Sequence, residues 1–158
     1  MSIICPIGGV IIKEIKPFTD SRGWLIELFR HDELEQQFHP AMSYISMTKP
    51  GVARGPHEHQ DQADLFGFIG PSTFRLYLWD NRPNSATFEM SCTYEFGDKR
   101  PASVIVPPGV AHAYKNIGQL EGIVYNAPNQ LYAGWGRNQP VDEVRHETDP
   151  NSKFKIDE

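Results

Sequence analysis

The chain has 158 residues, of which 39% are hydrophobic and 22% are charged, and it carries a formal net charge of −5. This length is typical of one globular domain, so we expect residues 1–158 to form a single domain. The composition excludes a disordered chain, and no apolar run is long enough to span a bilayer. The acidic charge, without a dense Lys/Arg block, argues against a nucleic acid as the main partner.

The N-terminal sequence 1–5 is apolar, but it lacks the charged start, long apolar run and cleavage site of a secretory signal peptide. We therefore expect a cytoplasmic protein. Cys5 and Cys92 are far apart and show no metal-ligand spacing. We interpret both as small buried hydrophobic residues.

Short β-type runs separated by Gly, Pro, Asn and Asp follow one another along the chain, and helical periodicity is plausible only at 32–38. In chain order, the predicted strands are residues 9–15, 24–30, 42–48, 65–69, 73–80, 87–94, 103–106, 113–116 and 122–126. Many short strands at this spacing favour a β-sandwich or a β-barrel.

Two histidines stand close together in the segment 54–59, which reads RGPHEH. If this segment is a strand, His57 and His59 project from the same face, because side chains alternate along a strand. A carboxylate, Asp64, and a glycine, Gly70, follow.

A third histidine follows a Pro-Gly turn in the segment 106–116, VPPGVAHAYKN. The turn at 107–109 delivers His112 to the start of the next strand. If the two histidine segments pair across a barrel, His112 faces His57 and His59.

The two segments resemble the two sequence motifs of the cupin superfamily. The matching residues are His57, His59, Asp64 and Gly70 in the first motif, with Asp where Glu is usual, and Pro107, Gly109, His112 and Asn116 in the second. This resemblance implies an all-β fold, the double-stranded β-helix or jelly-roll barrel of the cupins, with few short helices.

Within that superfamily the chain is similar, over nearly its whole length, to the dTDP-4-dehydrorhamnose 3,5-epimerase family. The segments that carry the similarity are 18–29, 51–57, 80–88, 107–112, Tyr125 and 149–150. Their order and spacing agree from one end of the chain to the other.

This resemblance implies an epimerase that acts on a nucleotide-linked 4-keto-6-deoxy sugar by removing and returning a proton next to the ketone. It implies no redox cofactor, no metal and a homodimer. It assigns His57 as the base, Tyr125 as the acid and Asp149 as the residue that orients the base. The implied substrate-binding residues are Arg22, Glu27, Arg54, His112 and Tyr132, of which the two arginines match residues that contact the diphosphate.

Two departures from the family pattern change the chemistry of the site. Asp64 stands where the family usually has lysine, and His59 stands where it usually has glutamine. Together with His57 and His112, these residues are suitable ligands for Zn²⁺, Mn²⁺, Fe²⁺ or Ni²⁺. The sequence therefore leaves open a second class, a metal-dependent cupin that is a different isomerase, a dioxygenase or a small-molecule binding protein.

Other assignments also have alternatives. Tyr125 is equally consistent with a core aromatic residue whose hydroxyl is satisfied. Arg22 and Arg54 are also consistent with ion pairs on the barrel. Met42 and Tyr44 replace the Gln-x-Asn pair with which the family reads the nucleotide base, so the usual recognition of thymidine is not expected.

Overall fold

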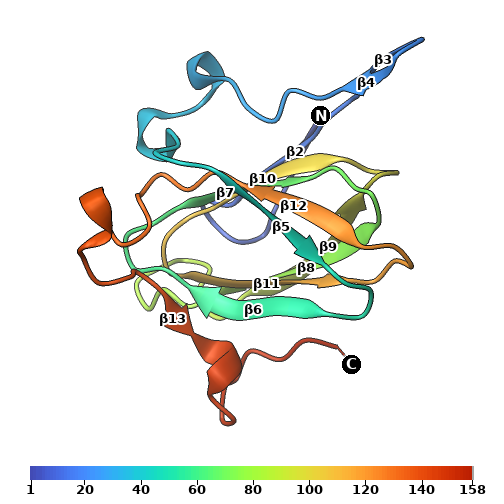
Figure 1. Cartoon of the computed structure of the whole chain (residues 1–158). Helices are drawn as coiled ribbons and strands as arrows, with labels where there is room; N and C mark the ends of the chain where they lie inside the picture. Colours follow the sequence, from blue (N-terminus) through green and yellow to red (C-terminus); the bar gives the residue numbers. More distant parts are fainter. Residues whose placement is uncertain (158) are drawn as a thin grey trace.

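The computed structural model describes residues 1–157, and most of its regular structure is antiparallel β-sheet (Figure 1). One sheet contains, in spatial order, β1 (Ser2–Ile3), β2 (Ile11–Glu14), β10 (Ala102–Val106), β7 (Asp64–Phe68), β12 (Gly122–Asn126) and β5 (Tyr44–Thr48). The second contains β13 (Val144–Arg145), β6 (Ala53–Glu58), β11 (Val110–Asn116), β8 (Thr73–Asp80) and β9 (Ser91–Gly97). The two sheets face each other, as the jelly-roll prediction requires, and the predicted fold class is confirmed.

Apolar side chains from both sheets fill the space between them. Phe68 of the first sheet and Phe74 of the second are completely buried, and so is Val124. Because side chains alternate along each strand, the residues next to these core positions face outward. A smaller cluster that includes Leu65 and Phe38 therefore forms on the outer face of the first sheet.

A separate hairpin, formed by β3 (Phe18–Asp20) and β4 (Gly23–Leu25), projects away from both sheets (Figure 1). Its side chains Phe18, Trp24 and Leu25 are 66%, 58% and 60% exposed.

Several predicted elements differ from the observed ones. The strands at 73–80 and 122–126 are found as predicted, but the strand predicted at 24–30 ends at Leu25. The strand predicted at 87–94 begins only at Ser91, because the residues before it form turns. Within residues 1–157, no helix is long and apolar enough to cross a bilayer.

The helical prediction for 32–38 is wrong. Two short 3₁₀ turns, η1 (His31–Glu33) and η2 (Gln36–Phe38), replace it. The residues between them, Leu34 and Glu35, have extended ψ angles of 140°, so the helical hydrogen-bond ladder is interrupted. Burial of Phe38 against the outer face of the first sheet anchors this segment instead.

Candidate functional site

Three histidines converge inside the barrel where β6 pairs with β11. His57 is the register partner of His112, and His59 follows directly after β6. The ring centroids of His57 and His112 are 4.5 Å apart, and those of His59 and His112 are 5.7 Å apart. One ring nitrogen from each histidine lies within 4.8 Å of the other two. The structure thus brings the three histidines singled out in the sequence into one cluster.

The glycine before the first histidine permits this close approach. Gly55 has a φ of 84°, and a Cβ atom there would lie 2.6 Å from the carbonyl oxygen of His112. Only glycine combines this backbone conformation with the absence of a side chain. The Arg-Gly-Pro-His sequence therefore lets β6 approach β11 closely at the level of His57.

A buried carboxylate completes the cluster. Asp64, at the start of β7, is 1% exposed, and its Oδ2 lies 3.0 Å from Nε2 of His59 and 3.3 Å from Nε2 of His112. Its Oδ1 accepts hydrogen bonds from Nε2 of Gln62 at 3.0 Å and from Nδ2 of Asn126 at 2.9 Å. These two amides, which the sequence motifs did not identify, orient the carboxylate so that Oδ2 faces the histidines.

Backbone carbonyl groups hold the other ring nitrogens of two histidines. Nδ1 of His112 donates to the carbonyl oxygen of Val110 at 3.0 Å, and Nδ1 of His59 donates to that of Asp142. The side chain of Asp142 also accepts three backbone N–H groups of residues 60–62, at 2.7, 2.8 and 2.9 Å. Asp142 therefore fixes both the loop after β6 and the His59 ring.

Burial and neighbouring charges shift the pKa values of the cluster residues in different directions. Burial, together with His112 and His59, lowers the pKa of His57 to about 2, so its imidazole is neutral at physiological pH. Burial also acts to lower the pKa of His59, but Asp64 and the carbonyl of Asp142 outweigh it and raise that pKa to about 9. Burial acts to raise the pKa of Asp64, but its contacts with His112 and His59 hold it well below its usual range.

The three histidines offer a divalent transition metal one nitrogen ligand each. Asp64 contacts two of them, and its buried Oδ2 lies 3.3 Å from the buried Nε2 of His112. Metal-binding histidines commonly donate their other N–H group to a carbonyl, as His59 and His112 do here. Three imidazoles and one carboxylate are suitable donors for Zn²⁺, Mn²⁺, Fe²⁺ or Ni²⁺.

A cavity of about 650 Å³ opens beside the cluster, and His59 lines it. Its volume lies within the range of roughly 300–1,000 Å³ that is usual for small-molecule sites. Tyr132, one of the expected substrate-binding residues, lies on its wall with Trp135, and these side chains are 55% and 83% exposed. Arg137 and Arg145 also line the cavity, together with Asp61, Asp142 and Glu143, and Arg145 pairs with Glu143 at 2.6 Å.

The structure corrects the expectation that Tyr125 lies in this site. Along β12, Val124 belongs to the interior core and Asn126 bonds to Asp64, so both point inward. Tyr125 lies between them and packs in the cluster around Leu65 on the outer face of the sheet. Its hydroxyl is therefore turned away from the histidines.

The late aspartate is also misplaced in the sequence-based prediction. Asp149 follows the 3₁₀ turn η4 (His146–Thr148), is exposed, and accepts the backbone N–H of Asn151 at 2.9 Å. Strand β13 places Arg145, rather than Asp149, opposite His57. Asp149 does not orient the His57 ring in this arrangement.

Three expected substrate-binding residues lie apart from the cluster within one copy of the chain. Arg22 has an 88% exposed side chain and pairs with Asp20 at 2.6 Å, on the projecting hairpin. Glu27 is exposed on the segment after it. Arg54 is exposed on β6 and donates to Oγ1 of Thr48 at 3.0 Å.

Comparison with known proteins gives a consistent result. The sequence model of a family described as dTDP-4-dehydrorhamnose 3,5-epimerase matches residues 5–139. The chain is 32% identical over 127 residues to the probable low-salt glycan biosynthesis epimerase Agl13 of Haloferax volcanii, covering 80% of this chain and 81% of that protein. It is 34% identical over 113 residues to the spore coat polysaccharide biosynthesis protein SpsL of Bacillus subtilis, covering 72% and 74%.

Solved structures show the same fold. A dTDP sugar isomerase from Desulfovibrio desulfuricans matches with a TM-score of 0.84 at 19% identity, covering 97% of this chain and 94% of that one. The similarity of fold therefore extends over nearly the whole chain.

Proposed function

Because this chain belongs to the dTDP-4-dehydrorhamnose 3,5-epimerase family, we propose that it epimerises a nucleotide-linked 4-keto-6-deoxy sugar. The observation that carries this proposal is the His57 ring, which bonds to no described residue, inside a polar cluster beside a cavity of ligand size. The sequence relatives favour this function over a metal-dependent cupin of another class.

His57 is the proposed base. No described residue forms a hydrogen bond with its ring, so a ring nitrogen is free to take the proton next to the ketone. The enolate that results needs a hydrogen-bond donor or a positive charge near its oxygen. Since Asp64 occupies the place of the family's lysine, the positive charge that remains at the cavity wall is that of His59, whose pKa is raised to about 9.

We propose that the reaction needs no redox cofactor and no resident metal. A divalent cation bound by His57, His59, Asp64 and His112 would supply Lewis-acid stabilisation of an oxyanion. However, a ring nitrogen of His57 that coordinates a metal is not available to accept a proton. The base function and metal binding at this residue therefore exclude each other.

We propose that the nucleotide part of the substrate occupies the large cavity. Tyr132 and Trp135 offer flat faces on which a base or sugar ring can stack, and Arg137 and Arg145 offer guanidinium groups for a diphosphate. Because Met42 also lines this cavity, the base is read by side chains different from the family's usual pair.

We further propose that the protein is a homodimer in the cytoplasm. The hairpin that carries Arg22 leaves Phe18 and Trp24 uncovered, and β5 is an edge strand whose outward Ile45 is 66% exposed. A second copy would cover these apolar groups and the free strand edge. It would also allow Arg22 and Glu27 to act at the site of the other copy.

The test is to incubate the purified protein in D₂O with dTDP-linked and with UDP-linked 4-keto-6-deoxyglucose. We expect deuterium at a carbon next to the ketone, and inverted product, with at least one of the two sugars. A protein that neither exchanges these hydrogens nor binds either nucleotide sugar would contradict the proposed function.

A further inference from the structure

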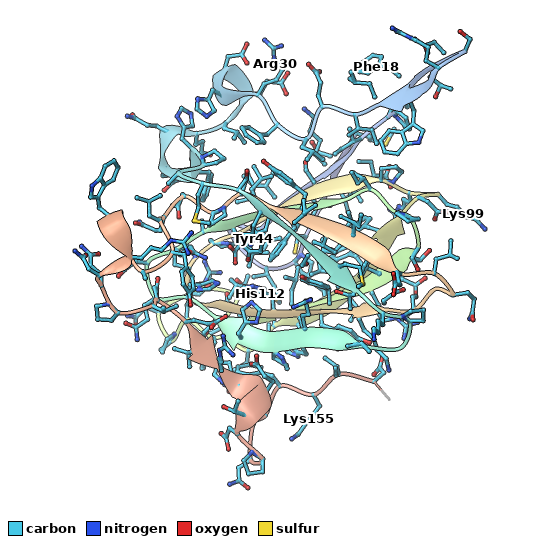
Figure 2. The ribbon with its side chains drawn as sticks, in the orientation of Figure 1. Phe18, Arg30, Tyr44, Lys99, His112 and Lys155 are labelled. Atoms are coloured by element: carbon cyan, nitrogen blue, oxygen red, sulfur yellow. The ribbon has the colours of Figure 1, made fainter. Side chains whose placement is uncertain are left out.

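Tyr44 is an inward-facing residue at the start of β5. On this strand Oγ of Ser46 bonds to the hydroxyl of Tyr114 at 2.9 Å, and Thr48 is 2% exposed. Since alternate residues of a strand share a face, Tyr44 lies on the same inner face as Ser46 and Thr48. Figure 2 labels Tyr44 and His112, and the Tyr44 side chain is 48% exposed because it lines the cavity.

The hydroxyl of Tyr44 is connected to the histidine cluster through Asn126. Nδ2 of Asn126 donates to the Tyr44 hydroxyl at 2.8 Å and to Oδ1 of Asp64 at 2.9 Å. Because Tyr44 accepts this hydrogen bond, its own phenolic proton remains free. No described residue takes that proton, and Tyr44 lines the cavity that His59 also lines.

No other tyrosine near the site both lines the cavity and is hydrogen-bonded to the histidine cluster among the described residues. Tyr114 is 5% exposed, and its hydroxyl is paired with Ser46 in the core. Tyr132 lines the cavity, but among the described residues its hydroxyl has no bond to the polar cluster. Tyr125 faces the outer surface of the sheet.

The positions of Tyr44 and His57 suit an inversion. Tyr44 belongs to the six-stranded sheet, whereas His57 belongs to the five-stranded sheet that faces it. A sugar ring that reached from the cavity to the histidine cluster would have the base on one side and the phenol on the other. Inversion of a carbon centre requires that the proton leave from one side and return to the opposite side.

Resting on the proposed epimerase function, we propose that Tyr44 is the catalytic acid of this enzyme. His57 takes the proton, and the electrons of the C–H bond form the enolate. The enolate carbon then bonds to the phenolic hydrogen of Tyr44, whose O–H bond breaks and leaves a phenolate. Water returns a proton to the phenolate and removes the proton from the His57 imidazolium.

Burial and the charge of Asp64 raise the pKa of Tyr44 to about 12, so the phenol carries its proton throughout the physiological range. The single bond from Asn126 holds the ring oxygen in place without consuming that proton. The position of Tyr44 and its protonated state therefore both suit it to donate a proton.

The test compares Tyr44→Phe, Tyr125→Phe and Tyr94→Phe with the wild type, in D₂O, using the nucleotide sugar on which the wild type acts. Each variant loses one hydroxyl group. Tyr94 lies on β9, away from the site, and serves as the matched control. We expect Tyr44→Phe to lower the rate of inversion at least about 100-fold, as loss of a general acid does. Deuterium exchange into unreacted substrate should persist, because His57 can return a deuteron to the side from which it removed the proton.

A Tyr44→Phe variant that inverts the sugar at the wild-type rate would overturn this assignment alone. Loss of inversion in Tyr125→Phe, with a wild-type rate of inversion in Tyr44→Phe, would also overturn it. A wild-type protein that neither exchanges nor inverts any nucleotide sugar would instead overturn the proposed function and this assignment together.

Discussion

Nε2 of His112 lies 3.3 Å from Oδ2 of Asp64, and both atoms are buried. The same carboxylate oxygen lies 3.0 Å from Nε2 of His59. This buried contact between a carboxylate and two imidazoles replaces the lysine that the family usually places here.

Removing the charge of Asp64 should impair the reaction with little change in shape. We expect Asp64→Asn to lower the rate of epimerisation about 100-fold, because the amide no longer attracts His59 and His112. Steady-state kinetics on the active nucleotide sugar measures this effect. Asp98→Asn, at an exposed turn, is the matched control. Wild-type activity in Asp64→Asn would show that the carboxylate has no part in the reaction.

Metal binding at the cluster should inhibit the enzyme. We expect chelator-treated protein to remain active and added Zn²⁺ to bind with loss of activity, because the metal occupies His57. His59→Ala should weaken Zn²⁺ binding at least about 10-fold, since it removes one of the four donors. Elemental analysis and titration with Zn²⁺ provide the measurements. Activity that chelation abolishes and metal restores would identify a working metal centre instead.

The sequence motifs predicted the histidine cluster well because local backbone rules determine it. Alternation along a strand directs His57 and His59 the same way, and the Pro-Gly turn sets the start of β11 before His112. The buried carboxylate Asp64 was also identified from its place in the motif. What these residues share is that their orientation follows from neighbours in the sequence.

The outward orientation of Tyr125 was not predictable in this way. A shift of one residue in a strand reverses every side chain, and sequence similarity alone does not determine that shift. The resemblance to the family assigned the acid to Tyr125. The alternation of side chains along β12, however, directs Asn126 inward and Tyr125 outward. A sequence signal for the proposed acid was available, because Tyr44 stands at one of the two positions with which the family usually reads the nucleotide base.

A second buried carboxylate supports the fold rather than the site. Oδ1 of Asp80 accepts the side chain of Arg82 at 2.8 Å, and its Oδ2 accepts the hydroxyl groups of Ser85 at 2.7 Å and Thr87 at 2.6 Å. Burial acts to raise its pKa, but these donors hold the pKa well below its usual range. The turns that displaced the predicted strand at 87–94 therefore depend on this charge.

We expect Asp80→Asn to lower the free energy of unfolding by about 3 kcal/mol at pH 7. A carboxylate whose pKa is lowered on folding stabilises the protein above its unfolded pKa, near 3.9, and this stabilisation is lost as the pH falls toward the folded pKa. The difference between wild type and variant should therefore shrink below about pH 4. Denaturant unfolding at several pH values tests this, and an equal difference at pH 7 and pH 3 would contradict it.

The projecting hairpin should hold two copies together. Light scattering should give a mass of twice 17.9 kDa for the wild type. Trp24→Glu should shift the protein toward the monomer, because it places a charge where a partner covers an exposed aromatic ring. Glu121→Gln, at an exposed turn, is a control that should remain dimeric. A wild-type monomer at micromolar concentration would rule out this interface.

The most direct test of the central claim is the rate of deuterium incorporation next to the ketone, compared between the wild type and His57→Asn. We expect rapid incorporation by the wild type and a rate at least about 1,000-fold lower in the variant, because the asparagine amide cannot accept the proton. Incorporation at the same rate in both proteins would show that His57 is not the base.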